Sequence, residues 1–541
     1  MKRSLIRDEQ LDLLAKYQFD VAVIGGGING AAVARDAAMR GLKVALIDKG
    51  DFAGATSSRS SKLIHGGLRY LAQGRIKLVR EALHERERLR NLTAPHLVWQ
   101  TRFLIPSYAG EGLSRIALAV GLSFYDRFAG FARDGRHRGL SAADASAMEP
   151  SLRREGLRGG ALYYDASTDD ARLTWENVLD AFEHGATIAN YVGLEGFSKE
   201  SGRISAAALR DSMGGRTIEL RARCFVNAAG PWTDDVRRLE DPGARAIVRL
   251  TKGCHLLISR ARIPVREALA LSTAGGQLLF VMPRDGYVLV GTTDTDFAGD
   301  REHVTADDGD IGYLLAMLNS FLPELRLDAA DVEASFAGLR ALVMSGDGAP
   351  ASVSREEMIE QSASGLISIA GGKLTTHRAI AERVVDRIMR MLGNSPGKCP
   401  TLDTPLPGAR AIGAAEQAGE ESTNNDFKYL DGAARERLGR YGTRARIVAE
   451  LALADADLAR AIAADCAVIG AEVVHAVRRE MAMTVSDCLL RRLGLGCNPH
   501  EARAAALEAS RLMARELGWS IERERVEQAS LFASVGGNPA S

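Results

Sequence analysis

Net charge is what this 541-residue chain lacks most clearly. Lysine plus arginine and aspartate plus glutamate each number 69, so the formal charge at pH 7 is zero. A neutral chain offers no whole-molecule argument for nucleic-acid binding, and none is expected. Residues 1–150 alone have a basic excess, which fits a phosphorylated ligand, an anionic membrane face or an ordinary solvated surface.

Cysteine is also scarce: six residues lie scattered along the chain, with no CxxC pair. The spacing argues against structural zinc sites, and a disulfide framework is not expected in a chain this long. The first twenty residues reach no apolar run before Asp8, Glu9 and Asp12, unlike a signal peptide. These features predict a reduced, cytoplasm-facing protein.

Long apolar runs are absent as well. No segment has the ~18 uninterrupted apolar residues of a membrane-spanning helix. The nearest, residues 112–131, is interrupted by Arg115, Asp126 and Arg127. We expect either a half-buried core helix or a helix that lies on a membrane surface.

The clearest local pattern lies near the amino terminus, in a chain whose length predicts about two to four domains. Residues 19–24 form a β-branched run typical of a buried strand, and residues 25–30 (GGGING) follow as a turn. An alanine-rich helix is expected over 31–39, ended by Gly41, and a second strand over 43–48. Together they predict one βαβ unit.

The glycine turn has the spacing of a dinucleotide-binding fingerprint. Gly25 permits the tight turn, Gly27 lets backbone approach a pyrophosphate, and Gly30 lets the helix pack on the sheet. The helix amino terminus favours phosphate. Asp48, at the end of the next strand, is placed to accept hydrogen bonds from ribose hydroxyls, which disfavours a 2′-phosphorylated cofactor.

Two further segments favour a flavin over a nicotinamide. Residues 55–70 (ATSSRSSKLIHGGLRY) bring hydroxyls, glycines and a His/Arg/Tyr cluster behind the second strand. A second glycine turn follows at residues 369–376 (IAGGKLTT). A cofactor that contacts two segments so far apart in the chain is expected to be large and permanently bound. This favours a flavin over a nicotinamide that exchanges.

The remaining chain shows three kinds of structure. Residues 217–227 read as a strand that enters a tight turn, and residues 245–300 as short antiparallel strands. A Pro/Gly-rich linker stands at 394–409, and the chain after it is alanine-rich and helical.

Seven segments carry a family resemblance: GGGING, ATSSRSSKLIHGGLRYL, YYDASTDDARLTWEN, NAAGPW, GTTDTDF, SFAGLRAL and GGKLTTHR. In this order the sequence resembles the FAD-dependent, quinone-linked glycerol-3-phosphate dehydrogenases over nearly its full length. The resemblance implies an α/β protein with a Rossmann-like FAD-binding domain of the glycine-oxidase/D-amino-acid-oxidase type, an antiparallel-sheet substrate domain and an α-helical C-terminal cap domain.

The expected domain division combines the resemblance with the composition of the chain. It assigns 1–80, 161–235 and 346–395 to the FAD-binding domain, 81–160 to a helical and substrate-domain insertion, 236–345 to the antiparallel-sheet substrate domain, 396–410 to a linker and 411–541 to the helical C-terminal domain.

The resemblance also implies the activity. Hydride would pass from the secondary carbinol carbon of sn-glycerol 3-phosphate to FAD, giving dihydroxyacetone phosphate, and electrons would then pass to a membrane quinone. Such an enzyme would be peripheral on the cytoplasmic face of the inner membrane and would contain no metal; the family often forms dimers, so a homodimer is among the expected forms. An oxygen-using oxidase and a catalytically silent flavin-binding protein are the alternatives.

The expected cofactor-binding residues come from the glycine turns and the segments beside them. They are Gly25, Gly27, Ile28, Asn29, Gly30, Asp48, Lys49, Thr56, Ser57, Ser58, Lys62, Leu63, His65, Gly66, Gly67, Ala229, Gly230, Gly371, Gly372, Lys373, Leu374 and Thr375.

The family's active-site pattern falls on a second set of residues. The catalytic candidates are His255, Arg340, Lys373 and His65, and the substrate-binding candidates are Arg69, Tyr70, Gln277, Arg340 and Lys373. Arg340 is the first candidate for the substrate phosphate, because a planar guanidinium can engage two oxygens. The two histidines are proton-acceptor candidates, with His255 ranked first. Lys373 is expected at the substrate or the flavin edge.

One departure from the family pattern bears on the substrate. Gln277 stands where the family usually has a phosphate-binding arginine, and Arg284 is a conceivable replacement. A different polyol phosphate, such as a tetritol phosphate (erythritol phosphate), is therefore the alternative substrate. His377 for tyrosine and Asp48 for glutamate are milder departures.

Overall fold

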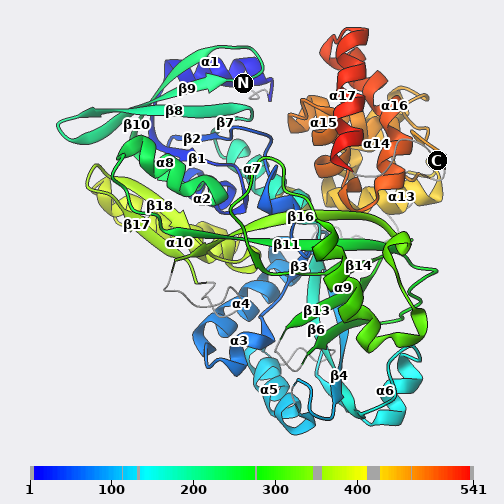
Figure 1. Cartoon of the computed structure of the whole chain (residues 1–541). Helices are drawn as coiled ribbons and strands as arrows, with labels where there is room; N and C mark the ends of the chain where they lie inside the picture. The colour runs from blue at the N-terminus through cyan, green and yellow to red at the C-terminus, as the bar shows by residue number, and fades with distance from the viewer. Residues whose placement is uncertain are drawn as a thin grey trace.

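The computed structural model describes residues 5–112, 114–130, 135–273, 277–284, 286–344, 356–410, 427–464 and 466–535. Two sheets and a separate group of helices make up its framework (Figure 1). The expected boundary at 345/346 and the expected helical segment 411–426 lie outside the described residues.

The first sheet is the nucleotide-binding frame. Its strand order is β17 (Met358–Gln361), β18 (Leu366–Ala370), β10 (Thr217–Asn227), β1 (Gln18–Ile24), β2 (Val44–Ile47) and β7 (Thr187–Ala189). The strands β18, β10, β1, β2 and β7 are mutually parallel. The hairpin of β8 (Val192–Glu200) and β9 (Arg203–Asp211) extends from β10. The predicted strands at 19–24, 43–48 and 217–227 are confirmed.

Helices cover both faces of this sheet (Figure 1). One face packs against α2 (Ile28–Met39), α7 (Asp170–Glu183) and α10 (His377–Met391), and its core includes Val21, Trp175 and Ile380. Alanines dominate the buried side of α2, so that helix lies close to the strands. The other face carries α1 (Arg7–Lys16) and α8 (Thr233–Glu240).

The second sheet is mostly antiparallel, as expected for residues 245–300. Its order is β15 (Thr295–Asp296), β11 (Val248–Ser259), β14 (Tyr287–Gly291), β13 (Leu278–Pro283), β12 (Ala268–Ser272), β4 (Val98–Tyr108), β6 (Leu157–Thr168) and β3 (Leu63–Ile64), with β16 (Val332–Val343) on β11 and β5 (Arg138–Leu140) on β6. Alternate residues of β11 face opposite cores, Leu256 toward α9 (Asp308–Phe321) and Leu257 toward α4 (Ile76–Arg88) and α5 (Arg115–Phe128).

The expected boundary at residue 160/161 is wrong in detail. It falls inside β6, which pairs with β4 along nearly its whole length. Because a strand is fixed by its ladder, residues 161–168 belong to the second sheet together with β3. The chain therefore leaves the second sheet only after Thr168, later than the expected boundary.

The expected linker at 396–410 is packed against the first domain. Its prolines begin two 3-10 turns, η8 (Pro400–Leu402) and η9 (Pro407–Ala409). Leu406 is fully buried, the Cys399 thiol donates to Asp36 Oδ1, and Arg35 donates to the carbonyl of Thr404. The prolines fix turns here and do not mark a free spacer.

The C-terminal region is helical, as predicted, with a core of its own. It contains α13 (Gly432–Leu438), α14 (Ala445–Ala454), α15 (Gly470–Glu480), a π-turn η11 (Asp487–Arg492), α16 (Pro499–Leu517) and α17 (Ile521–Ser534). The predicted helices are shorter than their alanine content suggested; α15 ends where Met481 adopts a φ of 53°. Within the described ranges, no helix is long and apolar enough to cross a bilayer.

Candidate functional site

A cavity of about 2080 Å³ is lined by residues of both sheets. It extends from the glycine turn after β1, past the end of β2, to His255 and Arg340 on the second sheet. This volume is about twice the upper end of ordinary small-molecule pockets, ~1,000 Å³. The cavity therefore suits a long ligand together with a smaller one.

The glycine turn forms one end of the cavity by keeping side chains out of it. Gly25 has a φ of 105°, and a Cβ there would lie 2.5 Å from the carbonyl oxygen of Ala228. A Cβ on Gly30 would lie 1.9 Å from the carbonyl oxygen of Gly25. The amino terminus of α2 begins at Ile28 beside this turn, so a phosphate in the cavity would meet its partial positive charge.

Asp48, directly after β2, places a half-buried carboxyl group on the cavity wall. Its Oδ2 accepts from the Gly26 amide at 2.6 Å, and its Oδ1 accepts from the Gly50 amide at 2.9 Å. Burial raises the pKa of Asp48 to about 6, against the lowering effect of these two hydrogen bonds. The group is placed to bind hydroxyls of a ligand at this end.

The second glycine turn lies against the first, although some 340 residues separate them. The Asn29 side-chain amide donates to the carbonyl of Gly371 at 3.4 Å. The Thr375 hydroxyl accepts from the amide of His65 at 3.1 Å and donates to its carbonyl at 3.3 Å. Gly371 and Gly372 have φ values of 74° and 85°. The two distant segments therefore form one wall of the cavity.

His255 lies at the far end, on β11. Its Nε2 is 2.8 Å from the Ser61 hydroxyl, and its ring stacks on Phe336 with centroids 4.8 Å apart. The side chain is 1% exposed. Burial, with Arg340 and Lys62 nearby, lowers the pKa of His255 to about 3, so the imidazole is neutral near pH 7.

Arg340, on β16, presents a guanidinium to the cavity beside this histidine. Nη2 donates to the Thr292 hydroxyl at 2.9 Å, and Nη1 donates to the Thr293 carbonyl and to Asp294 Oδ1, both at 3.2 Å. A Cβ on Gly253, across the ladder, would lie 2.2 Å from this guanidinium. The contacts fix the plane of the cation, which is what bidentate recognition of an anion requires.

A second group of cations lies around Tyr70. The Lys373 ammonium sits 4.1 Å from the centre of the Tyr70 ring, and the Arg69 guanidinium 5.6 Å from it. Gln277 lines the same cavity and is exposed. His65 also lines the cavity, with its ring edge-on to Phe280 at 6.5 Å.

Most of the predicted site residues line this cavity, and four of the cofactor candidates do not. Gly30 packs the helix on the turn, as expected of it. The Ser58 hydroxyl donates to the carbonyl of Ala55, Lys62 pairs with Asp170 at 2.5 Å, and the amide of Gly66 donates to the Tyr125 hydroxyl. The hydroxyl of Ser58, the ammonium of Lys62 and the amide of Gly66 therefore bind other groups of the protein and do not line the cavity.

Arg284 does not line the cavity and so does not replace the missing arginine in the described structure. Its guanidinium lies over the Trp99 ring at 5.5 Å. His377 is also removed from the site: it is buried, and its Nδ1 lies 2.7 Å from the carbonyl of Leu374.

Sequence reasoning did not single out several cavity residues, among them Ser61, Arg59 and Arg491. Ser61 and Arg59 lie within residues 55–70, next to residues that were predicted for the site. Their hydroxyl and guanidinium groups were the signals that could have identified them. Arg491 comes from the helical C-terminal domain, and no pattern in that region pointed to it.

Comparisons with known proteins agree with this geometry. A family model described as FAD dependent oxidoreductase matches residues 20–387, and one described as the C-terminal domain of alpha-glycerophosphate oxidase matches residues 399–524. The aerobic glycerol-3-phosphate dehydrogenase of Bacillus subtilis is 36% identical over 501 residues, covering 91% of this chain and 90% of that protein.

Solved structures extend the similarity to three dimensions. The glycerol-3-phosphate dehydrogenase from Bacillus halodurans, complexed with FAD, superposes with a TM-score of 0.81 at 32% identity, covering 98% of this chain and 96% of that one. Glycine oxidase from Geobacillus kaustophilus, with a TM-score of 0.52 at 20% identity, shares the fold over 69% of this chain and 95% of its own. The predicted fold class is confirmed.

Proposed function

Because the chain belongs to the FAD-dependent oxidoreductases, and among them to the aerobic glycerol-3-phosphate dehydrogenases, we propose that it oxidises sn-glycerol 3-phosphate to dihydroxyacetone phosphate. The observation that carries the proposal is the single cavity that joins a dinucleotide-binding turn to a cationic, histidine-bearing end.

The residues present fit FAD, the cofactor of this family. The turn at Gly25 and Gly30 leaves room only for backbone, and α2 points its amino terminus at that space. Asp48 supplies a carboxyl group for the ribose hydroxyls. When bound, FAD accepts the hydride from the substrate carbon. The chain holds it between its two glycine turns, with Asn29 and Gly371 in contact.

The substrate's phosphate needs fixed positive charge at the far end of the cavity. Arg340 lines the cavity and is held by hydrogen bonds to Thr292, Thr293 and Asp294, and Lys373 and Arg69 lie around Tyr70. We assign the phosphate to Arg340 first, because a bidentate guanidinium–phosphate contact fixes orientation as well as charge.

The hydroxyl proton requires a base as the hydride leaves. Two imidazoles line the cavity, and they differ in environment. A pKa of about 3 makes His255 a weak base in the resting site. We therefore place the proton on His65, and assign His255 to holding the Ser61 hydroxyl at 2.8 Å. The pH profiles of kcat/KM for His65→Asn and His255→Asn distinguish the two roles.

Anaerobic reduction of the bound flavin tests the proposed function. Purified holoenzyme mixed with sn-glycerol 3-phosphate should lose its yellow flavin absorbance within the turnover time, while glycerol and inorganic phosphate should leave it unchanged. If no polyol phosphate bleaches the flavin, the chain is a silent flavin-binding protein.

Gln277 favours one second candidate, oxidation of another polyol phosphate. It lines the cavity where the family usually has an arginine, and Arg284 does not take that place. A higher kcat/KM for a tetritol phosphate than for glycerol 3-phosphate would favour this second candidate.

We further propose that the electrons pass to a quinone at a membrane surface, with α5 as the docking element. Ile116, Val120 and Phe124, spaced four residues apart, are 78%, 53% and 52% exposed and form one apolar stripe with Arg127 on the same side. On the buried side, Leu118 lines the flavin cavity. A lipid-soluble acceptor entering beside α5 therefore has a short path to it.

A further inference from the structure

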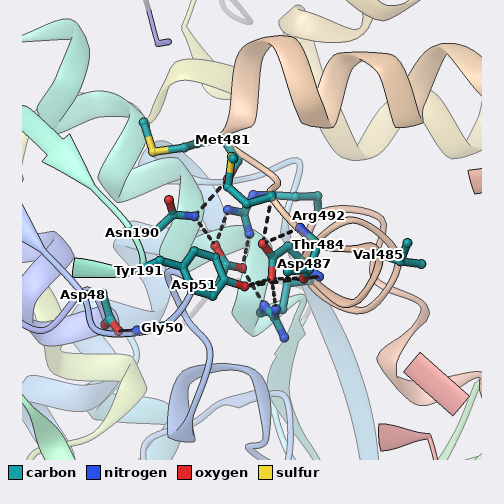
Figure 2. A network of polar contacts seen from close by, with 12 residues as sticks. Asp48, Gly50, Asp51, Asn190, Tyr191, Met481, Thr484, Val485, Asp487 and Arg492 are labelled. Atoms are coloured by element: carbon teal, nitrogen blue, oxygen red, sulfur yellow. Dashed lines mark hydrogen bonds and ion pairs between the residues drawn. The ribbon is translucent and has the colours of Figure 1, made fainter. Parts of the chain in front are cut away.

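The helical C-terminal domain meets the cofactor-binding domain in a buried cluster of polar side chains (Figure 2). η11 brings Arg491 and Arg492 to Asp51, four residues after β2. The Asp51 carboxylate accepts from both Nη atoms of Arg492, at 2.7 and 2.8 Å, and from Arg491 Nε at 2.6 Å. Asp51 and Arg492 are 3% and 1% exposed, so water does not screen this contact.

A second carboxylate completes the cluster. Asp487 accepts from the hydroxyls of Tyr191 and Thr484, each at 2.6 Å, and pairs with Arg491. Tyr191 lies between β7 and β8, and its amide donates to the carbonyl of Gly50 at 2.8 Å. Two arginines thus face two aspartates, and the helical domain holds the segment after β2 both directly and through Tyr191.

The segment that Asp51 anchors, residues 48–53, shapes the nucleotide end of the cavity. The Gly26 amide donates to Asp48 Oδ2 at 2.6 Å, and the Ala53 amide donates to the Gly26 carbonyl at 3.1 Å. Phe52 fills the space beside Gly26, where a Cβ would lie 2.3 Å from its ring. Asp51 thus links Arg492 to the segment that contacts the glycine turn.

Arg491 also lines the cavity, as does Arg59. In the described ranges, no carboxylate pairs with the Arg59 guanidinium, and burial together with Arg491 lowers its pKa. A negatively charged group in the cavity would relieve this repulsion between cations.

We propose that docking of the helical domain and retention of FAD are coupled through Asp51. Arg492, which does not line the cavity, is a positioning residue that acts through segment 48–53, and Arg491 also contributes positive charge at the cavity wall. FAD and the helical domain stabilise the same conformation of this segment, so each tightens the binding of the other. The coupling depends on FAD as cofactor and not on the identity of the substrate.

The first test compares FAD release from holoenzyme variants. We expect Arg492→Met to release FAD at least tenfold faster than wild type, measured by the rise in free-flavin fluorescence after dilution. Arg478→Met is the matched control: it removes a half-exposed arginine of the same domain whose ion-pair partner, Glu516, also belongs to that domain. Release from Arg492→Met at the wild-type rate, with unchanged circular dichroism, overturns the proposal.

The second test needs no variant. Hydrogen exchange of residues 481–493 is compared between holoenzyme and deflavinated wild type, with 499–534 as the internal reference. Coupling predicts that bound FAD slows the exchange of 481–493 by a larger factor than it slows the exchange of the reference helices. Equal exchange of 481–493 in both forms overturns the proposal. If Arg492→Met does not fold, this comparison alone tests the coupling.

Discussion

His255 is buried and Asp48 is half-buried, and loss of hydration disfavours the charged form of each, with opposite consequences. His255 stays neutral down to about pH 3, which removes a cation from the substrate end. Asp48 takes up a proton at about pH 6, which removes an anion from the ribose end. Arg340 differs from both, because a guanidinium stays protonated at every ordinary pH. Its hydrogen bonds to Thr292, Thr293 and Asp294 fix the position of this permanent charge.

Replacing Arg340 tests the phosphate assignment. A charged hydrogen bond contributes roughly 1.5–3 kcal/mol, so Arg340→Ala should raise KM for glycerol 3-phosphate by about one to two decades. The flavin should remain bound, as its absorbance will show. Arg284→Ala is the control, since Arg284 lies off the cavity wall. Turnover of Arg340→Ala with the wild-type KM would remove this residue from the substrate site.

Restoring the family's arginine tests the role of Gln277. The glutamine retains donors but has no charge, so Gln277→Arg should lower KM for glycerol 3-phosphate by up to about tenfold. Steady-state kinetics on glycerol 3-phosphate and a tetritol phosphate measure the change. A higher KM for glycerol 3-phosphate would favour the longer substrate.

The pKa of Asp48 predicts how pH affects FAD binding. In the proposed site, ribose hydroxyls would donate to the ionised carboxylate of Asp48, so a proton bound to it below about pH 6 would have to leave when FAD binds. The FAD dissociation constant should therefore rise by up to about tenfold per pH unit below 6 and be flat above it. Lys49 and Asp51 face the same carboxyl group. Fluorescence titration checks this, and Asp48→Asn should bind more weakly with no such slope.

Among the secondary-structure elements, α5 has two different faces. Leu122 and Tyr125 pack inward, and the Tyr125 hydroxyl holds Asp165 beside the amide of Gly66. The opposite side leaves Ile116 and Phe124 in solvent, where an apolar stripe has no partner in the described structure. One helix thus supports the segment at Gly66 on one side and carries on the other the apolar stripe that we propose docks on lipid.

Polar substitutions on the outer face of α5 test membrane docking. The combined variant Ile116→Ser/Val120→Ser/Phe124→Ser should lose binding to anionic phospholipid vesicles in a sedimentation assay and keep glycerol 3-phosphate activity with a soluble electron acceptor. Leu453→Ser and Leu507→Ser, at exposed leucines of the helical domain, are the controls. Wild-type protein that stays in the supernatant would refute docking by this face.

For the whole molecule, the cofactor site spans segments that only the fold brings together. The two glycine turns, the second sheet and η11 all reach one cavity. Other ion pairs add to the contact between domains, including the buried pair of Arg172 and Glu480 at 2.6 Å and the half-buried pair of Arg440 and Asp169. Cofactor binding and domain packing therefore belong to one cooperative structure.

Removal of FAD should lower the stability of the whole chain. A ligand that binds only the native state adds about 2.7 kcal/mol when its free concentration is 100 times its dissociation constant. Thermal unfolding of deflavinated protein should begin at a lower temperature, and added FAD should restore it. NAD is the control ligand, because it lacks the flavin ring. An unchanged transition without FAD would place the cofactor outside the folded core.

The sequence by itself determined the βαβ unit, the antiparallel character of the second sheet and a set of site residues, most of which line the cavity. These follow from local patterns: strand runs, glycine spacing and the motifs around His65 and Arg340. The tertiary structure alone decided that β6 joins the second sheet, that His255 is buried and neutral, and that Arg492 reaches Asp51. Burial and pairing are properties of the packed chain, because they depend on neighbours hundreds of residues away.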